Sequence, residues 1–267
     1  MSDVPADQVD AARAYESLFV PALFAQWTEP TASAADLQRG QAVLDVACGT
    51  GVLTAEAAER VGASGSVAGV DPNPGMLTVA GERLPAVDWR QGTAEDLPFP
   101  DARFDAVVSQ FGLMFFQDRG QALREMLRVL KPSGRLAVTV WDRIENIPGY
   151  FTEMQLIEKH AGTAAADAVR APFALGDREG VVDLLRGAGA VSVSATTPSG
   201  RARFPSIRTM AEAELRGWLP LMGVSLEEAI IQTILNEAES DLAAYATVSG
   251  ELDFEVTAHV VAAQKAA

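Results

Sequence analysis

Short apolar runs alternate with longer amphipathic stretches along the first half of the chain. The runs predict strands at residues 43–46, 67–71, 87–91, 104–110 and 135–141. After the first run, an amphipathic stretch predicts a helix that ends at Gly62. Strands that alternate with helices indicate a parallel sheet with right-handed crossovers, so the pattern predicts an α/β fold.

Two of the later helices begin at recognisable capping residues. Asn73 is a typical N-cap, and Pro74 suits the first helical position because it needs no hydrogen-bond partner for its nitrogen. Asp118 is placed to cap the next helix. The apolar side chains of that helix follow at steps of three, one and three, which places them on one face: Leu123, Met126, Leu127 and Leu130.

The second half of the chain is less regular. Residues 191–195 predict a strand, residues 226–245 a long helix, and the alternation around Phe254 a closing strand. Residues 142–178 and 206–250 lie outside the simple alternation. We expect both to be cap insertions at the ligand edge of a single domain that spans residues 1–267.

Composition narrows the class of protein. The chain has 267 residues, of which 48% are hydrophobic, so it can bury a large core. No apolar stretch approaches the ~20 residues of a membrane span, and the start carries acidic residues, so we expect a cytoplasmic protein without membrane contact. Cys48 is the only cysteine and the chain has two histidines, so we expect no metal site.

The net charge of −15 disfavours contact with a phosphate backbone, which requires clustered Lys and Arg. We therefore expect no nucleic-acid partner. A small-molecule partner fits better, and the acidic surface is typical of a soluble monomer or homodimer.

The stretch VLDVACGTGVLT, residues 43–54, combines a strand, the carboxylate of Asp45 and a glycine turn. Ligands of open parallel sheets lie at the carboxyl ends of the strands, where turn amides can face them. A P-loop would need Lys and Ser or Thr after Gly51, where Val52 and Leu53 stand. A dinucleotide motif would need a third glycine where Thr54 stands, so a nicotinamide-dependent oxidoreductase is the less favoured alternative.

Four segments in order resemble the class I methyltransferases that use S-adenosylmethionine (SAM), and within them the group related to ubiquinone and menaquinone biosynthesis. The segments are LDVACGTG, VAGVDPNPGML, GTAEDLPFPDARFDAVVSQFGLMFF and REMLRVLKPSGRLAVTVW, which lie within residues 41–142. This resemblance implies a Rossmann-like, seven-stranded, mostly parallel sheet with helices on both faces and a small helical cap.

The resemblance also implies a SAM site. Asp71 ends the second strand, 71 − 51 = 20 residues after Gly51, where a carboxylate can accept from both ribose hydroxyls. Cys48 is expected to be a small buried residue of the turn rather than a nucleophile. The residues expected to bind SAM are Trp27, Asp45, Ala47, Cys48, Gly49, Thr50, Gly51, Asp71, Pro72, Asn73, Met76, Gly92, Thr93, Ala94, Glu95, Gln110, Phe111, Gly112 and Phe115.

Two positions depart from the family pattern. Ala47 replaces the usual first glycine of the turn, and we expect only a slight displacement of the cofactor. Thr93 stands where the family commonly has an Asp that accepts from the adenine amine. The hydroxyl of Thr93 or the carboxylate of Glu95 then takes that role.

The activity implied is transfer of a methyl group from SAM to a small-molecule acceptor, with no residue assigned as a catalytic base. The other alternative is a SAM-binding protein without transferase activity. Residues 1–40 contain Tyr15, Phe19, Phe24 and Trp27 and are expected to form a helical lid over the cofactor. Phe111, Phe115 and Phe116 are candidates to line the acceptor pocket or to face the sulfonium.

Overall fold

The structure is a computed structural model of the chain and describes residues 4–267, so the first three residues of the predicted lid lie outside it. The chain divides into two compact units. The first contains the residues up to 140 together with 177–198 and 259–267, and the second contains residues 141–176 and 199–258.

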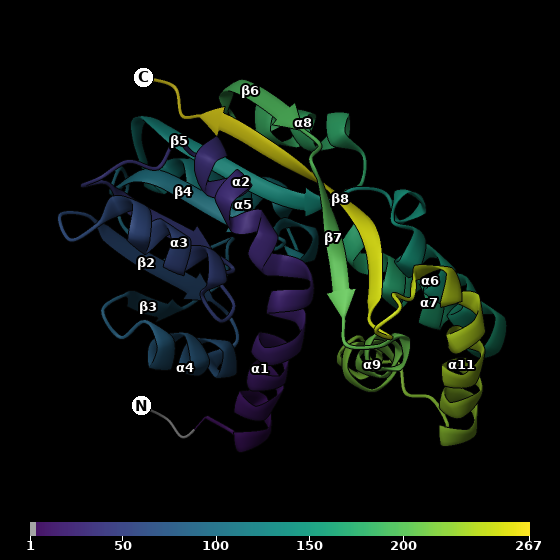
Figure 1. Cartoon of the computed structure of the whole chain (residues 1–267). Helices are drawn as coiled ribbons and strands as arrows, with labels where there is room; N and C mark the ends of the chain where they lie inside the picture. Colours follow the sequence, from purple (N-terminus) through teal and green to yellow (C-terminus); the bar gives the residue numbers. More distant parts are fainter. Residues whose placement is uncertain (1–3) are drawn as a thin grey trace. The chain divides into compact units, whose positions relative to one another are not determined.

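The first unit is built on a sheet with the strand order β3-β2-β1-β4-β5-β8-β6 (Figure 1). The first five of these strands pair in parallel, and β8 is antiparallel to β6. An eighth strand, β7, pairs with the first half of β8 in the second unit, so the seven-stranded prediction lacked one strand. The bounds are β1 Ala42–Val46, β2 Ser66–Asp71, β3 Asp88–Gln91, β4 Phe104–Gln110, β5 Leu130–Trp141, β6 Val191–Thr196, β7 Ser199–Phe204 and β8 Leu252–Gln264.

Helices of the first unit pack on this sheet and on one another: α1 contacts α4, α2 contacts α3, and α5 contacts α8. A buried cluster that includes Val43, Leu53 and Val108 joins α2, α3 and the central strands, so the core lies directly behind the glycine turn. The bounds are α1 Ala6–Phe19, the π-turn η1 Val20–Phe24, η2 Ala25–Trp27, α2 Thr28–Ala34, α3 Val52–Val61, α4 Pro74–Arg83, η3 Leu113–Phe115, α5 Arg119–Val129 and α8 Arg178–Gly187.

The predicted caps are confirmed. The Asn73 side chain accepts from the amides of Gly75 and Met76, and Pro74 is the first residue of α4. The Asp118 side chain accepts from the amide of Gln121 at the start of α5. Because these side chains replace the missing helical partners of the first amides, both helices begin where the sequence predicts.

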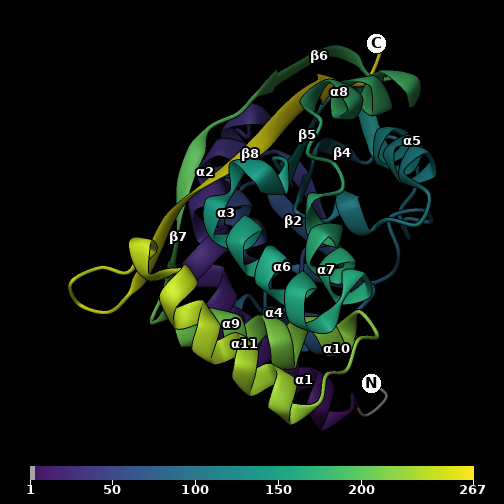
Figure 2. The ribbon, with the colours of Figure 1, turned by 90° about the vertical axis from the view of Figure 1, so that its right-hand side faces the viewer.

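The second unit is mainly helical, with α6, α7, α9 and α11 visible together in Figure 2. The long helix predicted over 226–245 is α11 followed by a single turn, η7. The bounds are η4 Ile144–Asn146, α6 Pro148–Ala161, α7 Thr163–Arg170, η5 Ala171–Phe173, α9 Ile207–Ala213, η6 Glu214–Trp218, α10 Leu219–Leu221, α11 Glu228–Asp241 and η7 Ala243–Tyr245. Within residues 4–267, no helix combines the length and apolarity that a membrane crossing requires.

Candidate cofactor site

The glycine turn is fixed from both ends by a buried carboxylate. Asp45 lies in β1, and its Oδ2 accepts a hydrogen bond from the Thr54 hydroxyl of α3 at 2.6 Å. This contact ties the strand that enters the turn to the helix that leaves it. Burial raises the pKa of Asp45 to about 7, with a smaller contribution from the charge of Asp71, while the Thr54 hydrogen bond lowers it.

The turn itself has a left-handed backbone at three positions. Gly49 and Gly51 have φ of 54° and 85°, and Ala47 has φ of 59°. The first two conformations suit glycine, whereas an alanine in this region costs about 1–2 kcal/mol. The departure at Ala47 therefore places a strained residue inside the candidate site, as is common where a backbone is shaped for a ligand.

Asp71 connects the ends of β1 and β2. Its Oδ2 accepts from the Gly49 amide at 2.9 Å, and its Oδ1 accepts from the Asn73 amide at 2.9 Å. A carboxylate has about four acceptor positions, so these two bonds leave capacity for two more donors. The same carboxylate that shapes the turn can thus hold a pair of hydroxyl groups.

The predicted aromatic segment near the N-terminus lies at this end of the sheet. Tyr15 stacks on Phe24 with 5.4 Å between ring centroids, and Phe24 contacts Phe111 at 5.4 Å. Trp27 is buried and meets Phe111 edge-on at 6.1 Å. Burial raises the pKa of Tyr15, and the charge of Asp71 raises it further, so this ring lies near the carboxylate.

Gln110 holds that segment against the sheet. Its Nε2 donates to the Phe24 carbonyl at 3.1 Å, and its Oε1 lies 3.5 Å from the Thr31 hydroxyl. The Thr31 and Thr139 hydroxyls are 2.6 Å apart. The sequence predicted Gln110 as a cofactor residue. In the structure its amide positions the N-terminal segment, with the help of Thr31 and Thr139. The sequence analysis did not single out these two threonines.

Two buried hydroxyls near the strand ends have no partner among residues 4–267: Thr50 Oγ1 in the turn and Ser109 Oγ in β4. A Cβ added to Gly112 would lie 2.9 Å from Ser109 Oγ and 2.6 Å from the Cβ of Ala47. The ends of β1 and β4 therefore meet closely at Gly112. Unpaired buried hydroxyls are uncommon in folded proteins, and they are typical of a surface that receives a polar ligand.

The segment after β3 lies beside β2, since the Gly92 amide donates to the Asp71 carbonyl at 3.2 Å. Glu95 is already engaged, because its Oε1 accepts from the amides of Gln117 and Asp118 at 2.8 and 3.3 Å. The Glu95 carboxylate keeps acceptor positions of its own, as Asp71 does, so the hydroxyl of Thr93 and the carboxylate of Glu95 both stay candidates for the adenine amine.

Other predicted site residues take simpler places. Cys48 is buried, burial raises its pKa, and its Sγ faces Gly69, so it is a neutral packing residue. Met76 and Pro72 lie at the start of α4, and the Pro72 carbonyl accepts from Gln91 at 3.0 Å. Phe115 is 48% exposed in η3. Among the residues that the structure describes, no group of three or more His, Cys, Asp and Glu side chains is arranged to hold a metal ion.

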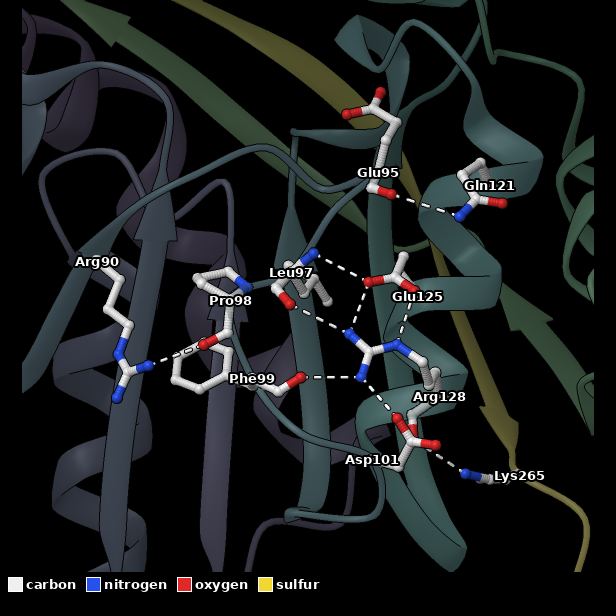
Figure 3. A network of polar contacts seen from close by, with 10 residues as sticks. All are labelled: Arg90, Glu95, Leu97, Pro98, Phe99, Asp101, Gln121, Glu125, Arg128 and Lys265. Carbon is white, nitrogen blue, oxygen red and sulfur yellow. Dashed lines mark hydrogen bonds and ion pairs between the residues drawn. The ribbon is translucent and has the colours of Figure 1, made fainter.

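A polar network anchors the loop between β3 and β4 to α5 (Figure 3). Arg128 pairs with Glu125 through two contacts of 2.7 Å and donates to the carbonyls of Phe99 and Leu97 at 2.8 and 3.1 Å. Glu125 in turn accepts from the Leu97 amide at 3.0 Å. Because the same loop begins with Gly92 and Thr93, the network positions one wall of the candidate site.

Replacing Arg128 with lysine is expected to lower the free energy of unfolding by about 1–2 kcal/mol, because an ammonium group cannot make the forked contacts to Glu125 and two carbonyls together. Chemical denaturation measures the change. Arg124→Lys on the same helix is the control, since Arg124 is exposed and its Nε donates to the Gln121 side chain at 3.2 Å. Equal stability of the two variants would contradict a role for the network.

Asp45 also makes stability depend on pH. Its pKa is about 7 in the folded protein and 3.8 ordinarily, so between these values the folded state holds the extra proton. Stability therefore falls as pH rises through this window. Between pH 6 and pH 8 the free energy of unfolding should fall by about 1 kcal/mol more in the wild type than in Asp45→Asn. The asparagine keeps an acceptor for Thr54 but does not titrate. Denaturation curves with identical pH slopes would contradict this assignment; other buried carboxyls affect both proteins equally.

Residues 44–138 match the methyltransferase domain family. This part of the chain is similar to that family. The ubiquinone/menaquinone biosynthesis C-methyltransferase UbiE of Cronobacter sakazakii is 46% identical over 118 residues, which are 42% of this chain and 47% of that protein. The chain thus spans about half the length of the curated relatives it matches.

Solved structures confirm the Rossmann-like α/β fold. Phosphoethanolamine N-methyltransferase 2 of Haemonchus contortus superposes with a TM-score of 0.60 at 17% identity, over 97% of this chain and 58% of that chain. The (4+2)-cyclase SpnF superposes with a TM-score of 0.54 at 21% identity, over 91% of this chain and 81% of that chain. Identities this low establish the fold alone.

Proposed function

We propose that this chain is a SAM-dependent methyltransferase that acts on a small-molecule acceptor. The observation that carries the proposal is the junction of β1 and β2, where Asp71 holds the Gly49 amide and keeps acceptor capacity beside a left-handed glycine turn. A pair of ribose hydroxyls fits that carboxylate. The methyltransferase domain match over residues 44–138 supports the same ligand.

The remaining residues of the site divide the cofactor among them. The Thr50 and Ser109 hydroxyls are unpaired donors and acceptors for its polar groups. For the adenine amine, the candidates are the hydroxyl of Thr93 and the remaining acceptor positions of Glu95, whose Oε1 is held by two backbone amides. The ring of Phe111, backed by Phe24 and Trp27, suits a cationic sulfonium, since aromatic faces attract positive charge.

SAM supplies a methyl group activated by the sulfonium charge. The chain then has to align the acceptor with that methyl group and exclude water, which can account for about 7–11 kcal/mol of the barrier. Tyr15, Phe24 and Trp27 provide an apolar cover, and Gln110 with Thr31 fixes its position. Alignment alone suffices for an acceptor that ionises readily, such as a phenol, whereas a carbon or aliphatic hydroxyl acceptor also needs a base.

We further propose that acceptor selection depends on the predicted cap insertions 142–178 and 206–250, most of which lie in the second unit, together with the N-terminal segment. We assign residues 43–112 of the first unit to SAM, so they leave few side chains for the acceptor. Irregular segments on a rigid fold are where specificity commonly varies. The cytoplasmic setting and the monomeric or homodimeric state stay predictions.

Calorimetric titration of the purified chain with SAM and with S-adenosylhomocysteine tests the proposal, followed by incubation with methyl-labelled SAM and a panel of phenols and amines. Binding of both compounds and transfer of label to an acceptor are expected. The absence of heat with either compound, on folded protein, would contradict the proposed cofactor. Binding without transfer to any acceptor would favour a non-transferase role, which the fold permits, since the cyclase SpnF shares it.

A further inference from the structure

The second unit contains two buried carboxyl groups that lie close enough to affect each other. Glu153 on α6 has no exposed surface, and Glu214 at the start of η6 is 6% exposed. Burial raises the pKa of Glu153, and the charge of Glu214 raises it further. Burial raises the pKa of Glu214 to about 7. Two carboxylates in such surroundings require a compensating positive charge or a proton.

Direct sharing of a proton does not account for the arrangement. Neither carboxyl oxygen of Glu153 has a hydrogen-bond partner among residues 4–267, and therefore no hydrogen bond joins Glu153 to Glu214. A neutral Glu153 would leave a buried O–H donor unpaired, which costs about 1–3 kcal/mol. A group that donates to Glu153 from outside the chain would remove this cost.

Tyr150 connects Glu214 with two further aromatic rings. Tyr150 donates a hydrogen bond to Glu214, and its ring contacts Phe173 at 5.6 Å and Phe254 at 5.8 Å between centroids. Aromatic faces beside carboxylates are the surroundings in which an organic ammonium group is bound favourably. Glu214 and Tyr150 keep 6% and 7% of their surface exposed, whereas Glu153 keeps none, so solvent touches the first two residues alone of the three.

We propose that Glu153 and Glu214 form a binding site for the protonated amino group of a small aromatic or aliphatic amine. The ammonium N–H groups donate to the unpaired oxygens of Glu153 and to Glu214, and the organic part packs on Tyr150 and its neighbouring rings. Tyr150, Glu153 and Glu214 all belong to the second unit. Such a site distinguishes an amine from an alcohol of the same shape, because only the amine carries the compensating charge.

The test uses the full chain with saturating S-adenosylhomocysteine and two probes of equal size, phenethylamine and 2-phenylethanol, each titrated by calorimetry at pH 7.5. Phenethylamine is expected to bind at least tenfold more tightly than the alcohol. Glu153→Gln should weaken the binding of phenethylamine at least tenfold and leave the affinity for 2-phenylethanol unchanged. Glu158→Gln is the matched control on α6, because Glu158 is exposed and paired with Arg170.

Equal affinity of wild type for the two probes, or amine binding that survives Glu153→Gln, would overturn the proposal. Glu214→Gln gives a second variant in case the first fails to fold. A glutamine variant that is more stable than the wild type, with no preference for amines in either protein, would show that the pair is simply satisfied by a proton or water. Binding of S-adenosylhomocysteine is measured in the same samples. A chain that binds this compound but does not prefer the amine would contradict the amine site and would still support the proposed cofactor.

Discussion

Replacing Asp71 with alanine is expected to weaken SAM binding by about 1.5–3 kcal/mol, the scale of hydrogen bonds that involve a charged group, which corresponds to roughly 10- to 150-fold in the dissociation constant. Two effects combine. The ribose hydroxyls lose their acceptor, and the Gly49 amide loses the contact of 2.9 Å that helps to hold the turn. Calorimetric titration with SAM measures the change.

Asp71→Asn separates these two effects, since an amide oxygen still accepts from one backbone amide but carries no charge. We expect the SAM affinity of Asp71→Asn to lie between the affinities of Asp71→Ala and the wild type. Ser206→Ala is the control for loss of a cap, because Ser206 accepts from the Thr209 amide in the second unit. An unchanged dissociation constant in Asp71→Ala would show that this residue only organises the start of α4.

Replacing Gly69 with alanine is expected to lower the free energy of unfolding by about 3 kcal/mol, the upper part of the range for overpacking a core. A Cβ at this buried position in β2 would lie 2.3 Å from the Trp89 ring and 3.0 Å from the Cys48 sulfur. The indole cannot move freely, because its Nε1 donates to the Leu84 carbonyl at 3.0 Å.

The Trp89 indole also packs beneath the glycine turn. A Cβ on Gly51 would lie 2.8 Å from Trp89, so the ring fills the space beneath both glycines. Displacing it in Gly69→Ala should therefore weaken SAM binding as well as stability. Trp89→Leu in the same chain is expected to recover part of the loss, since the two sites are in contact and their effects are not additive.

Gly187→Ala provides the matched control for Gly69, because a Cβ there meets no atom within 4 Å and the residue ends a helix without a left-handed φ. Chemical denaturation gives the free energy of unfolding of the wild type, of Gly69→Ala with and without Trp89→Leu, and of Gly187→Ala. Similar stability of Gly69→Ala and Gly187→Ala would contradict the close approach of Trp89.

The sequence by itself predicted the elements whose signals are local. The caps at Asn73 and Asp118 are confirmed, because these side chains accept from helical amides two or three residues later. The helix that follows the glycine turn is confirmed as well. The α/β class followed from the alternation of strands and helices. The places of Asp45 and Asp71 at the strand ends also followed from chain order, since parallel strands bring their carboxyl ends to one edge.

The tertiary structure alone decided which of these side chains are engaged by others. Glu95 is taken up by amides 22 and 23 residues away, and Gln110 by a carbonyl 86 residues away. Trp89 fills the space beneath Gly51 and Gly69, and Glu153 is buried beside Glu214, 61 positions later in the numbering (214 − 153). Such contacts depend on how distant segments pack, and no local pattern encodes them. Hence the sequence by itself predicted the turn and the carboxylate of the candidate cofactor site. The contacts of Gln110 with the N-terminal segment and the buried acidic pair were decided by packing between segments far apart in the chain.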